Sequence, residues 1–339
     1  MLKSKLSLLL LMVSLFSVSG QVLKKRTTLL MGGKFEITIV AKDAQSAQDN
    51  IDTVIKEIKR IEDLISDWKS TSQVSEVNRN AGIKPIKVDA EVFKLTESAI
   101  HLSQLTNGAF DISFAAMDKI WKFDGSMEKM PTAAAIAKSV EKVGYKNIEL
   151  DRANSTIFLK LEGMKIGFGA LGEGYAADRC REMMLKKGIK AGIVNASGDM
   201  SAWGKPPKQK HWAIGITNPF NKDSLFGIVP LKNNAMVTSG SYEKFVIFNG
   251  KRYAHIINPK TGYPSTGLTS VTVFGPDAML ANGLSTSIMV LGKAHGLALM
   301  KQFPSYSCIL FNDEQNYFAA NLSDSEIKRW KKAAKKKVW

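Results

Sequence analysis

The chain has 339 residues, 45% of them hydrophobic, and its formal net charge at pH 7 is +16. A chain of this size and composition can bury one large core or two smaller ones, which excludes a disordered protein and a disulfide-stapled miniprotein. Its two cysteines, Cys180 and Cys308, lie far apart and outside any C-x-x-C motif, which disfavours zinc and thioredoxin-like chemistry. We expect both to be buried and inert, with a disulfide between them as the less favoured alternative.

The N-terminus has the layout of a secretory signal. Lys3 and Lys5 precede an apolar run at residues 6–18, which ends in small residues at 18–20, just before Gln21. This run is shorter than the roughly 20 residues that span a bilayer, so an uncleaved anchor is the weaker interpretation. We expect residues 1–20 to be removed near Gly20, and the protein to be exported to the periplasm or the outer face of the cytoplasmic membrane.

The C-terminus is strongly basic. Residues 326–339 hold seven Lys or Arg against one acid, Glu326. We interpret residues 324–339 as a helical tail, separate from a main domain at residues 21–323. Such a helix could contact anionic lipid or an acidic partner, although a solvated terminal helix is the simpler interpretation. Nucleic acid binding is disfavoured by export.

The predicted elements alternate between strands and a few long helices. A strand at residues 34–40 precedes a helix with an apolar stripe over 51–65, and Asp89 caps a second helix that ends before Asn107 and Gly108. A hairpin (147–150 and 156–160), a strand (164–167), a helix (173–187) and a strand (191–195) follow. The later elements are strands at 212–216, 226–230, 235–238, 253–257, 270–274, 307–310 and 317–319, with helices starting near Asp277 and Lys293. This order predicts an α+β fold with mixed or antiparallel sheets flanked by helices, in two lobes with a ligand cleft between them.

A glycine-rich segment between the strand at 164–167 and the following helix carries the spacing G-x-G-x-x-G at Gly167, Gly169 and Gly172. In dinucleotide-binding proteins such glycines let the backbone approach a pyrophosphate at a helix N-terminus. A Rossmann enzyme also requires an acidic residue about 20 positions later to hold a ribose, whereas Asn195 stands there and Asp199 comes late. An NAD-dependent enzyme is therefore the least favoured interpretation, and close glycine packing without any ligand remains open.

Asn282 and Thr286 are four residues apart in a segment with helical spacing, so their side chains share one helix face. Their oxygens could bind a hard cation such as Mg²⁺, which usually keeps water and substrate phosphates among its ligands. From spacing alone, a pair of packing or surface residues is the simpler interpretation.

Three other residues are candidates for contact with a ligand. Asp111 follows a helix stop and is either a ligand contact or a turn cap. His255 ends a predicted strand just before a turn, where functional residues are common, although a structural role is equally open. Trp68, in a loop, could stack on an aromatic ring or fill the edge of a core.

Several motifs in a fixed order resemble the FAD:protein FMN transferase (ApbE-like) family, over about residues 28 to 312. They are Met31-Gly32, the Trp68 loop with SEVN at 75–78, GAFD at 108–111, GFGALGEGYAAD at 167–178, SGD at 197–199, TSG at 238–240, HIINP-x-TG at 255–262 and DA-x-x-ANGLST at 277–286. The resemblance implies a T-fold-like architecture and a cleft for FAD. It also implies a reaction in which a Ser or Thr hydroxyl of a partner redox protein attacks the FMN phosphorus and AMP leaves. The acceptor is expected to be membrane-associated.

The resemblance also assigns roles by position. Mg²⁺ would be held by the backbone carbonyl of Ala170 and by the side chains of Asn282 and Thr286, and His255 would position or deprotonate the nucleophile. The flavin nucleotide would be lined by Met31, Trp68, Ala109, Phe110, Asp111, Gly167, Glu173, His255 and the backbone near Ile256.

Two departures from the family pattern concern charge. Asn282 and Gly167 stand where family members commonly have Asp, so the implied cation site lacks a formal negative charge at both positions. Hard cations prefer charged oxygens, which makes FAD binding better supported than catalysis. The alternative function is an exported FAD-binding protein, or an FAD pyrophosphatase, with a weakened metal site.

Overall fold

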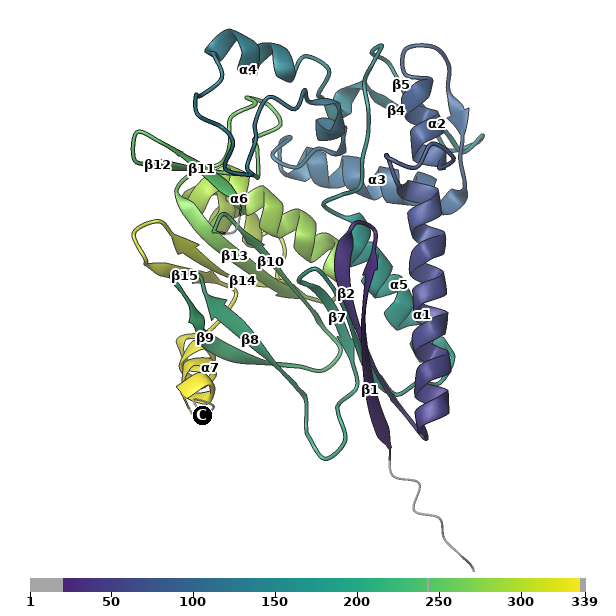
Figure 1. Cartoon of the computed structure of the whole chain (residues 1–339), viewed down its shortest axis with the longest axis vertical. Helices are drawn as coiled ribbons and strands as arrows, with labels where there is room; N and C mark the ends of the chain where they lie inside the picture. Colours follow the sequence, from purple (N-terminus) through teal and green to yellow (C-terminus); the bar gives the residue numbers. More distant parts are fainter. Residues whose placement is uncertain (1–20, 243, 336–339) are drawn as a thin grey trace, which may run out of the picture.

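The computed structural model describes residues 21–242 and 244–335, so the predicted signal at 1–20 lies outside the described residues. An eight-stranded sheet forms its centre, in the order β1-β2-β6-β7-β10-β13-β14-β15, and every neighbouring pair is antiparallel (Figure 1). These strands are β1 Val22–Leu30, β2 Gly33–Ala41, β6 Ala191–Ala196, β7 Asp199–Trp203, β10 Ala235–Gly240, β13 Leu268–Gly275, β14 Ser307–Asn312 and β15 Tyr317–Ala320.

Smaller sheets and helices surround this sheet. The other strands are β3 Ile86–Lys87, β4 Ile148–Asp151, β5 Thr156–Leu159, β8 Trp212–Asn218, β9 Asn221–Leu231, β11 Phe245–Phe248 and β12 Lys251–Ala254. The helices are α1 Ala44–Ile65, α2 Gln73–Arg79, α3 Ala90–Leu105, α4 Ala133–Ser139, α5 Gly172–Lys186, α6 Ala278–Met300 and α7 Asp324–Lys335, with 3₁₀ turns at η1 Ile112–Ala116 and η2 Tyr145–Asn147.

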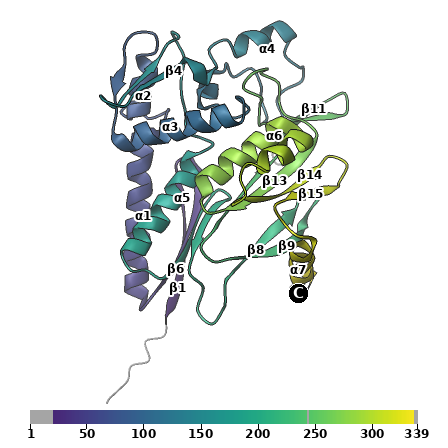
Figure 2. The same cartoon turned by 180° about the vertical axis from the view of Figure 1, so that it is seen from behind.

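Both faces of the central sheet are covered. Helices α1, α5 and α6 pack on one face, while the β8–β9 hairpin and α7 cover the other (Figures 1 and 2). In β2 the alternation is direct, since Ile37 and Ile39 face the helices and Val40 joins the cluster on the hairpin side. A sheet buried on both sides explains why β13 is buried at all eight positions.

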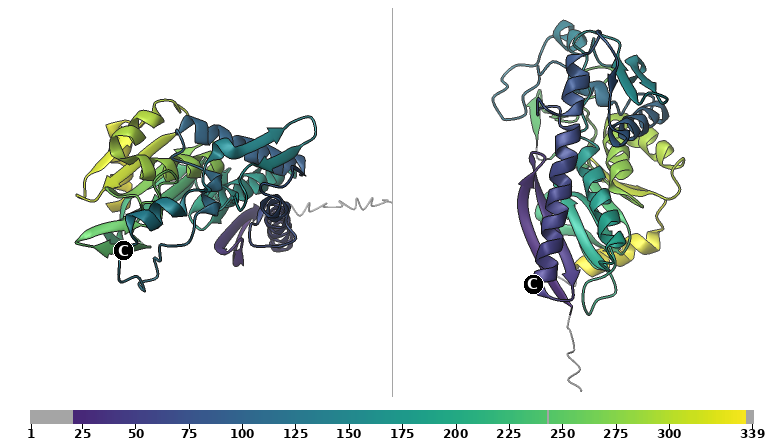
Figure 3. Two further views of the ribbon diagram at one scale, coloured as in Figure 1. Left: turned by 90° about the horizontal axis from the view of Figure 1, so that it is seen from above. Right: turned by 90° about the vertical axis from the view of Figure 1, so that its right-hand side faces the viewer.

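A second lobe stands on one end of this layered body (Figure 1). It contains α2, α3, the small sheet β3-β5-β4 and α4. Seen from above, its elements extend beyond the central sheet, whereas α1 runs along the whole body below it (Figure 3). Trp121 in the long connection before α4 donates a hydrogen bond from Nε1 to the carbonyl of Gly262, at 2.9 Å, which ties this connection to the turn after β12.

The α+β prediction with antiparallel sheets is confirmed, and so are most predicted elements. Asp89 caps α3 as expected, with its side chain accepting a hydrogen bond from Glu91 N. The two predicted late helices form one run, α6, which is interrupted at Gly292, where φ is 74° and ψ is 178°.

Two predicted strands are corrected, and four strands were missed. Residues 164–167 are not a strand, because the side-chain amide of Asn78 takes the place of a partner strand and makes both hydrogen bonds to the backbone of Ile166. The predicted strand at 253–257 ends at Ala254, beyond which Ile257 makes only an isolated bridge to Pro264. Strands β1, β3, β7 and β11 were not predicted.

The C-terminal helix exists, but it is part of the fold. Trp330 of α7 is buried and packs against Phe274 of the central sheet, and Ile327 and Ala334 are buried beside it. Both cysteines are buried and unpaired, as expected. None of the helices within residues 21–242 and 244–335 combines the length and apolar character needed to cross a membrane.

Candidate active site

The first part of the site is the turn between β1 and β2. Met31 has a left-handed backbone, with φ of 51°, and Gly33 follows at the start of β2. A Cβ atom at Gly33 would lie 2.2 Å from Ser197 Oγ and 2.4 Å from Glu173 Oε1, so any larger residue would displace these two side chains. Close packing at Gly33 thus brings together the β1–β2 turn, the β6–β7 turn and the first turn of α5.

The glycine-rich segment forms a loop that ends at the N-terminus of α5. A Cβ atom at Gly174 would lie 2.8 Å from the carbonyl carbon and oxygen of Ala278, so α5 and α6 touch at their first turns. One residue past Ala170, Leu171 reaches within 3.3 Å of the Cβ position of Gly283. The loop that carries Ala170 therefore lies beside Asn282.

Asn282 and Thr286 meet on one face of α6, as their spacing predicts. Thr286 Oγ1 donates a hydrogen bond to Asn282 Oδ1 at 3.2 Å, and Asn282 Nδ2 donates to Asp199 Oδ2 at 2.6 Å. Asp199 is the first residue of β7 and is buried. It was not predicted as a site residue, although it follows a hairpin turn in which Ser197 and Gly198 both have positive φ.

Three carboxyl groups gather at this point. Burial is the main cause that raises the pKa of Asp199 to about 8 and that of Glu173 to about 7. The negative charges of Glu173 and Asp178 add to the rise at Asp199, whereas hydrogen bonds from Asn282 to Asp199 and from Ser197 to Glu173 oppose the two shifts. Burial therefore outweighs hydrogen bonding at Asp199 and Glu173, while the third acid, Asp178, has Arg181 Nη2 at 3.7 Å from its Oδ1.

Asp178 has a structural task in this cluster. Its Oδ2 accepts hydrogen bonds from Ala278 N at 2.7 Å and Met279 N at 3.0 Å, the first amides of α6, and its Oδ1 accepts one from Ser201 Oγ. Burial raises its pKa to about 6, against these hydrogen bonds. Asp178 thus joins α5 to α6 and to β7.

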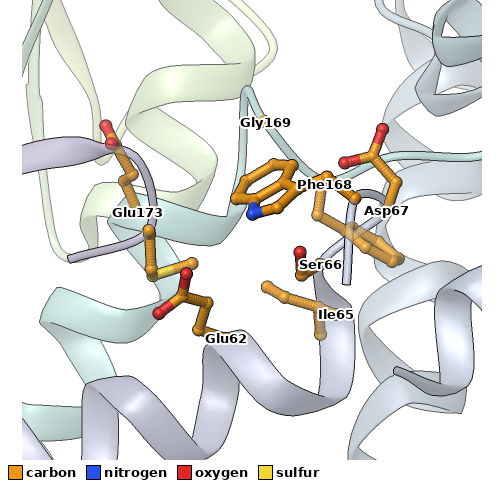
Figure 4. Close-up of a pocket in the computed structure, with 9 residues that line it drawn as sticks. Glu62, Ile65, Ser66, Asp67, Phe168, Gly169 and Glu173 are labelled. Carbon is orange, nitrogen blue, oxygen red and sulfur yellow. The ribbon is translucent and has the colours of Figure 1, made fainter. Parts of the chain in front are cut away.

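A hollow opens beside the cluster (Figure 4). It lies between the end of α1, the turn after β1 and the start of α5, and Trp68 beside it is 60% exposed. Its lining residues are Met31, Glu62, Ile65, Ser66, Asp67, Trp68, Phe168, Gly169 and Glu173. Three predicted flavin-lining residues, Met31, Trp68 and Glu173, therefore share one hollow. A fourth, Gly167, lies near it, since a Cβ there would be 3.1 Å from Asp67 Oδ2.

The predicted contacts at 109–111 are buried. Asp111 Oδ1 accepts hydrogen bonds from the N and Oγ of Ser113, and its Oδ2 accepts one from Tyr145 N. These bonds match the turn-cap interpretation, in which Asp111 holds η1 and the start of η2. Ala109 and Phe110 are buried beside it, so their flavin contact remains a prediction.

His255 lies at the end of the β11–β12 hairpin and is exposed. Its Nδ1 is 3.2 Å from the carbonyl oxygen of Lys244, and its ring packs edge-on to Phe123. The carbonyl of Ile256 accepts a hydrogen bond from Ser265 N. The Lys260 side chain, in the turn that follows, reaches within 3.0 Å of the Cβ position of Gly108, which brings this turn beside the 108–111 segment.

Comparisons with known proteins identify the family. The ApbE family model matches residues 31–310, which is most of the chain. The chain is 30% identical over 278 residues to the FAD:protein FMN transferase of Klebsiella pneumoniae (strain 342), covering 81% of this chain and 85% of that protein. Over 282 residues it is also 30% identical to the protein of the same name from Salmonella typhimurium, with 81% and 80% covered.

Solved structures agree with this assignment. The ApbE protein of Thermotoga maritima superposes with a TM-score of 0.79 at 28% identity, covering 88% of this chain and 97% of that one. Pseudomonas stutzeri flavinyl transferase ApbE gives a TM-score of 0.78 at 25% identity, with 92% and 98% covered. The family model and the relatives named FAD:protein FMN transferase identify the protein as a transferase. The chain belongs to the ApbE family.

Proposed function

We propose that the protein transfers FMN from FAD to a Ser or Thr side chain of an acceptor protein and releases AMP. The observation that carries the proposal is the convergence of the Ala170 loop, Asn282 and Thr286 beside a hollow that contains Trp68 and Met31. A hollow with an exposed indole suits an isoalloxazine ring, and oxygen donors beside it suit a cation on the pyrophosphate. The relatives named FAD:protein FMN transferase support the same reaction.

The oxygen donors fit Mg²⁺. Oxygens on adjacent corners of a Mg²⁺ octahedron lie about 3 Å apart, given metal–oxygen distances of about 2.1 Å. Asn282 Oδ1 and Thr286 Oγ1 are 3.2 Å apart, and the carboxyl group of Asp199 accepts a hydrogen bond from the side-chain amide of Asn282. No group of three His, Cys, Asp or Glu side chains in the described residues could hold a metal, so the set would depend on Ala170, Asn282 and Thr286. When bound, Mg²⁺ would neutralise pyrophosphate charge and polarise the phosphorus under attack.

The chain's residues would position the two reactants. In the proposed reaction the acceptor oxygen forms a bond to the FMN phosphorus, the bond from that phosphorus to the bridging oxygen breaks, and AMP takes the bridging oxygen. The acceptor hydroxyl loses one proton in this step. His255, at the exposed end of a hairpin, is the group proposed to orient this hydroxyl or to accept its proton. Ala109, Phe110, Asp111, Gly167, Glu173 and Ile256 are the further proposed flavin neighbours.

We further propose that the protein works outside the cytoplasm, after cleavage near Gly20, on a membrane-associated redox protein. The basis is the signal-like sequence at residues 1–20. Phosphoester-linked flavin would then be added to the acceptor after both proteins have been exported.

The test is incubation of the mature protein with FAD and Mg²⁺, with and without a domain that bears an acceptor Thr. AMP release together with covalent flavin on the acceptor would establish the transferase. AMP without labelled acceptor would indicate a pyrophosphatase, and retained intact FAD would indicate a binding protein. The bond from Asn282 to Asp199, in place of a carboxylate at position 282, is the feature that favours these alternatives.

A matched pair of variants tests the cation site within the same assay. Thr286→Val removes one proposed ligand oxygen and preserves the shape of the side chain. Ser287→Ala is the control, because Ser287 Oγ donates to the Gly283 carbonyl within the helix. Loss of activity in Thr286→Val that extra Mg²⁺ partly restores, with Ser287→Ala active, would support the site. Equal activity in both variants would reject it.

A further inference from the structure

One end of the central body collects lysines from connections that are far apart in sequence. Ala41 pairs with Val22, Ala191 with Val40, and Trp203 with Gly192. Because of this register, four segments lie at the same end of the sheet. They are the start of β1, the connection from α5 to β6, the β7–β8 loop and the β9–β10 turn. Figure 1 shows this end at the bottom of the molecule, with α7 at the lower left.

These connections are almost purely cationic. The three segments 186–190, 204–211 and 232–234 contain no Asp or Glu. They contribute seven exposed lysines, here called the basic end: Lys186, Lys187, Lys190, Lys205, Lys208, Lys210 and Lys232. Within the described part of the chain, none of these seven ammonium groups forms an ion pair. The neighbouring Lys42 and Asp43 offset each other in charge.

Helix α7 adds further positive charge to the surface, but its apolar side chains are not available for insertion into a membrane. Its apolar side chains Ile327, Trp330 and Ala334 are buried against the β8–β9 side of the sheet. Its outward cations are Lys328, Arg329, Lys332 and Lys335, against Asp324 and Glu326 at its start. The helix therefore cannot insert an apolar face into lipid without leaving the fold, and only its charge is available at the surface.

Until the proposed cleavage near Gly20, the signal-like sequence would keep the basic end next to a membrane, which favours a membrane over an acidic protein as the partner. Residues 1–20, whose sequence includes the apolar run at 6–18, join the described fold at Gln21, immediately before β1 at the basic end. The candidate active site lies at the other end of the β1–β2 hairpin and of α1. A helix of the length of α1, 22 residues, spans about 33 Å.

We propose that the basic end is a docking surface for an anionic lipid bilayer, which holds the candidate active site about one α1 length away from the headgroups. Lysine clusters near a membrane are attracted by anionic headgroups over a Debye length, without any apolar insertion. The proposal is independent of the flavin chemistry, because none of its residues lines the hollow or the cation site.

The test measures partition of residues 21–339 onto vesicles by sedimentation. One vesicle is an equal mixture of phosphatidylglycerol and phosphatidylcholine, and the other is phosphatidylcholine alone. We expect binding only to the anionic vesicle, with loss at high salt. Reversal of the β7–β8 loop charges, by Lys205→Glu, Lys208→Glu and Lys210→Glu together, should lower partition about a hundredfold or more.

A control with the same change in net charge separates location from total charge. Lys129→Glu, Lys138→Glu and Lys146→Glu together change exposed lysines in and near α4, on the second lobe. This variant should still bind the anionic vesicle within about twofold of the unchanged protein. Equal loss in both triple variants would overturn the proposal, as would absence of binding to the anionic vesicle. Tight binding to polyglutamate with no vesicle binding would overturn it in favour of an acidic protein partner.

Discussion

Asn282 donates a hydrogen bond of 2.6 Å from its side-chain amide to the carboxylate of Asp199, a residue 83 positions earlier in the chain. Because Thr286 donates to the amide oxygen, both ends of the Asn282 side chain are oriented. A second acid group therefore lies one hydrogen bond away from position 282, on β7, but burial raises the pKa of Asp199 to about 8, so this group is largely uncharged at neutral pH without a cation. In the proposed cation site, a bound Mg²⁺ would favour the ionised form of Asp199 and so recover part of the charge that Asn282 lacks.

This bond predicts the effect of restoring a carboxylate. In Asn282→Asp without Mg²⁺, two buried carboxyl groups would face each other, so one of them would have to stay protonated to replace the hydrogen bond that Asn282 Nδ2 donates now. We expect the free energy of unfolding to fall by about 3 kcal/mol, and most of the loss to be recovered with Mg²⁺. Thermal unfolding measured with and without Mg²⁺ checks this.

The exchanged pair is the control for that measurement. Asn282→Asp combined with Asp199→Asn reverses donor and acceptor but keeps the hydrogen bond. The double variant should be closer in metal-free stability to the unchanged protein than Asn282→Asp alone is. If the single variant is equally stable with and without Mg²⁺, position 282 does not contact the cation.

Gly174 predicts a second effect, because it lies at the contact of two helix N-termini. Gly174→Ala would place a methyl group 2.8 Å from the Ala278 carbonyl, where only backbone movement can relieve the clash. We expect a loss of at least about 2 kcal/mol in stability and weaker FAD binding. Gly169→Ala is the matched control, since nothing lies within 4 Å of its Cβ position. Equal unfolding curves for both variants would contradict the close contact.

The hydrogen bonds to Glu91 predict how the stability of the helical layer changes at acid pH. Burial raises the pKa of Glu91, but hydrogen bonds from Arg60 and Tyr175, with the charge of Arg60, outweigh this and leave the pKa below 4.5. A lowered carboxyl pKa contributes stability above the unfolded value, about 4.3, which is lost as the pH falls through the folded pKa. Glu91→Gln should cost about 1–2 kcal/mol at neutral pH and flatten the loss below pH of about 4.

A second acid on the same helix is the control. Glu97 pairs with Arg152 at 2.7 Å, but the Arg152 side chain is 80% exposed. Glu97→Gln should change stability by no more than about 0.5 kcal/mol at neutral pH. Denaturant unfolding across acid pH measures both variants, and a larger effect from Glu97 would show that the network on Glu91 is not what stabilises the layer.

The exposure of Trp68 predicts that a substitution there changes FAD binding but not the stability of the fold. Its side chain is largely exposed and lines the hollow, so Trp68→Ala should leave the unfolding midpoint nearly unchanged. Loss of a stacking surface should weaken FAD binding by about 1–2 kcal/mol, and Trp68→Phe should recover part of it. Flavin fluorescence titration measures this, and unchanged FAD affinity in Trp68→Ala would place the ring elsewhere.

Trp330 predicts that the basic helix is needed for the fold. Trp330→Ala would leave a void between α7 and Phe274 and should cost about 3 kcal/mol or more. Lys332→Ala, on the exposed face of the same helix, should change stability by less than about 0.5 kcal/mol. Similar unfolding midpoints for the two variants would mean that residues 324–339 behave as the separate tail expected from sequence.

Local signals in the sequence were sufficient for the elements that depend on local chemistry. Asp89 caps α3, the spacing of Asn282 and Thr286 puts both on one helix face, and α5 begins within one residue of its predicted start. Each of these depends on neighbours within one or two helical turns, where capping and periodicity are informative.

Long-range contacts could not be read in the same way. The segment at 164–167 has the composition of a strand, yet the amide of Asn78, 88 positions before Ile166, supplies its hydrogen bonds. Asp199 joins the site only because the register of β6 with β2 and β7 carries the turn at Ser197 to the start of α5. A side chain that replaces a strand, or a turn that is brought close by sheet register, leaves no periodic pattern in the sequence.

Asp178 gives the site a fixed frame. It accepts hydrogen bonds from the first amides of α6 while it belongs to α5, so the loop with Ala170 and the helix with Asn282 and Thr286 are held as one rigid unit. The surrounding hairpins and the long connection before α4 are attached to other elements of the fold. Changes in those peripheral segments can therefore leave the arrangement of the Ala170 carbonyl and the Asn282 and Thr286 oxygens unchanged.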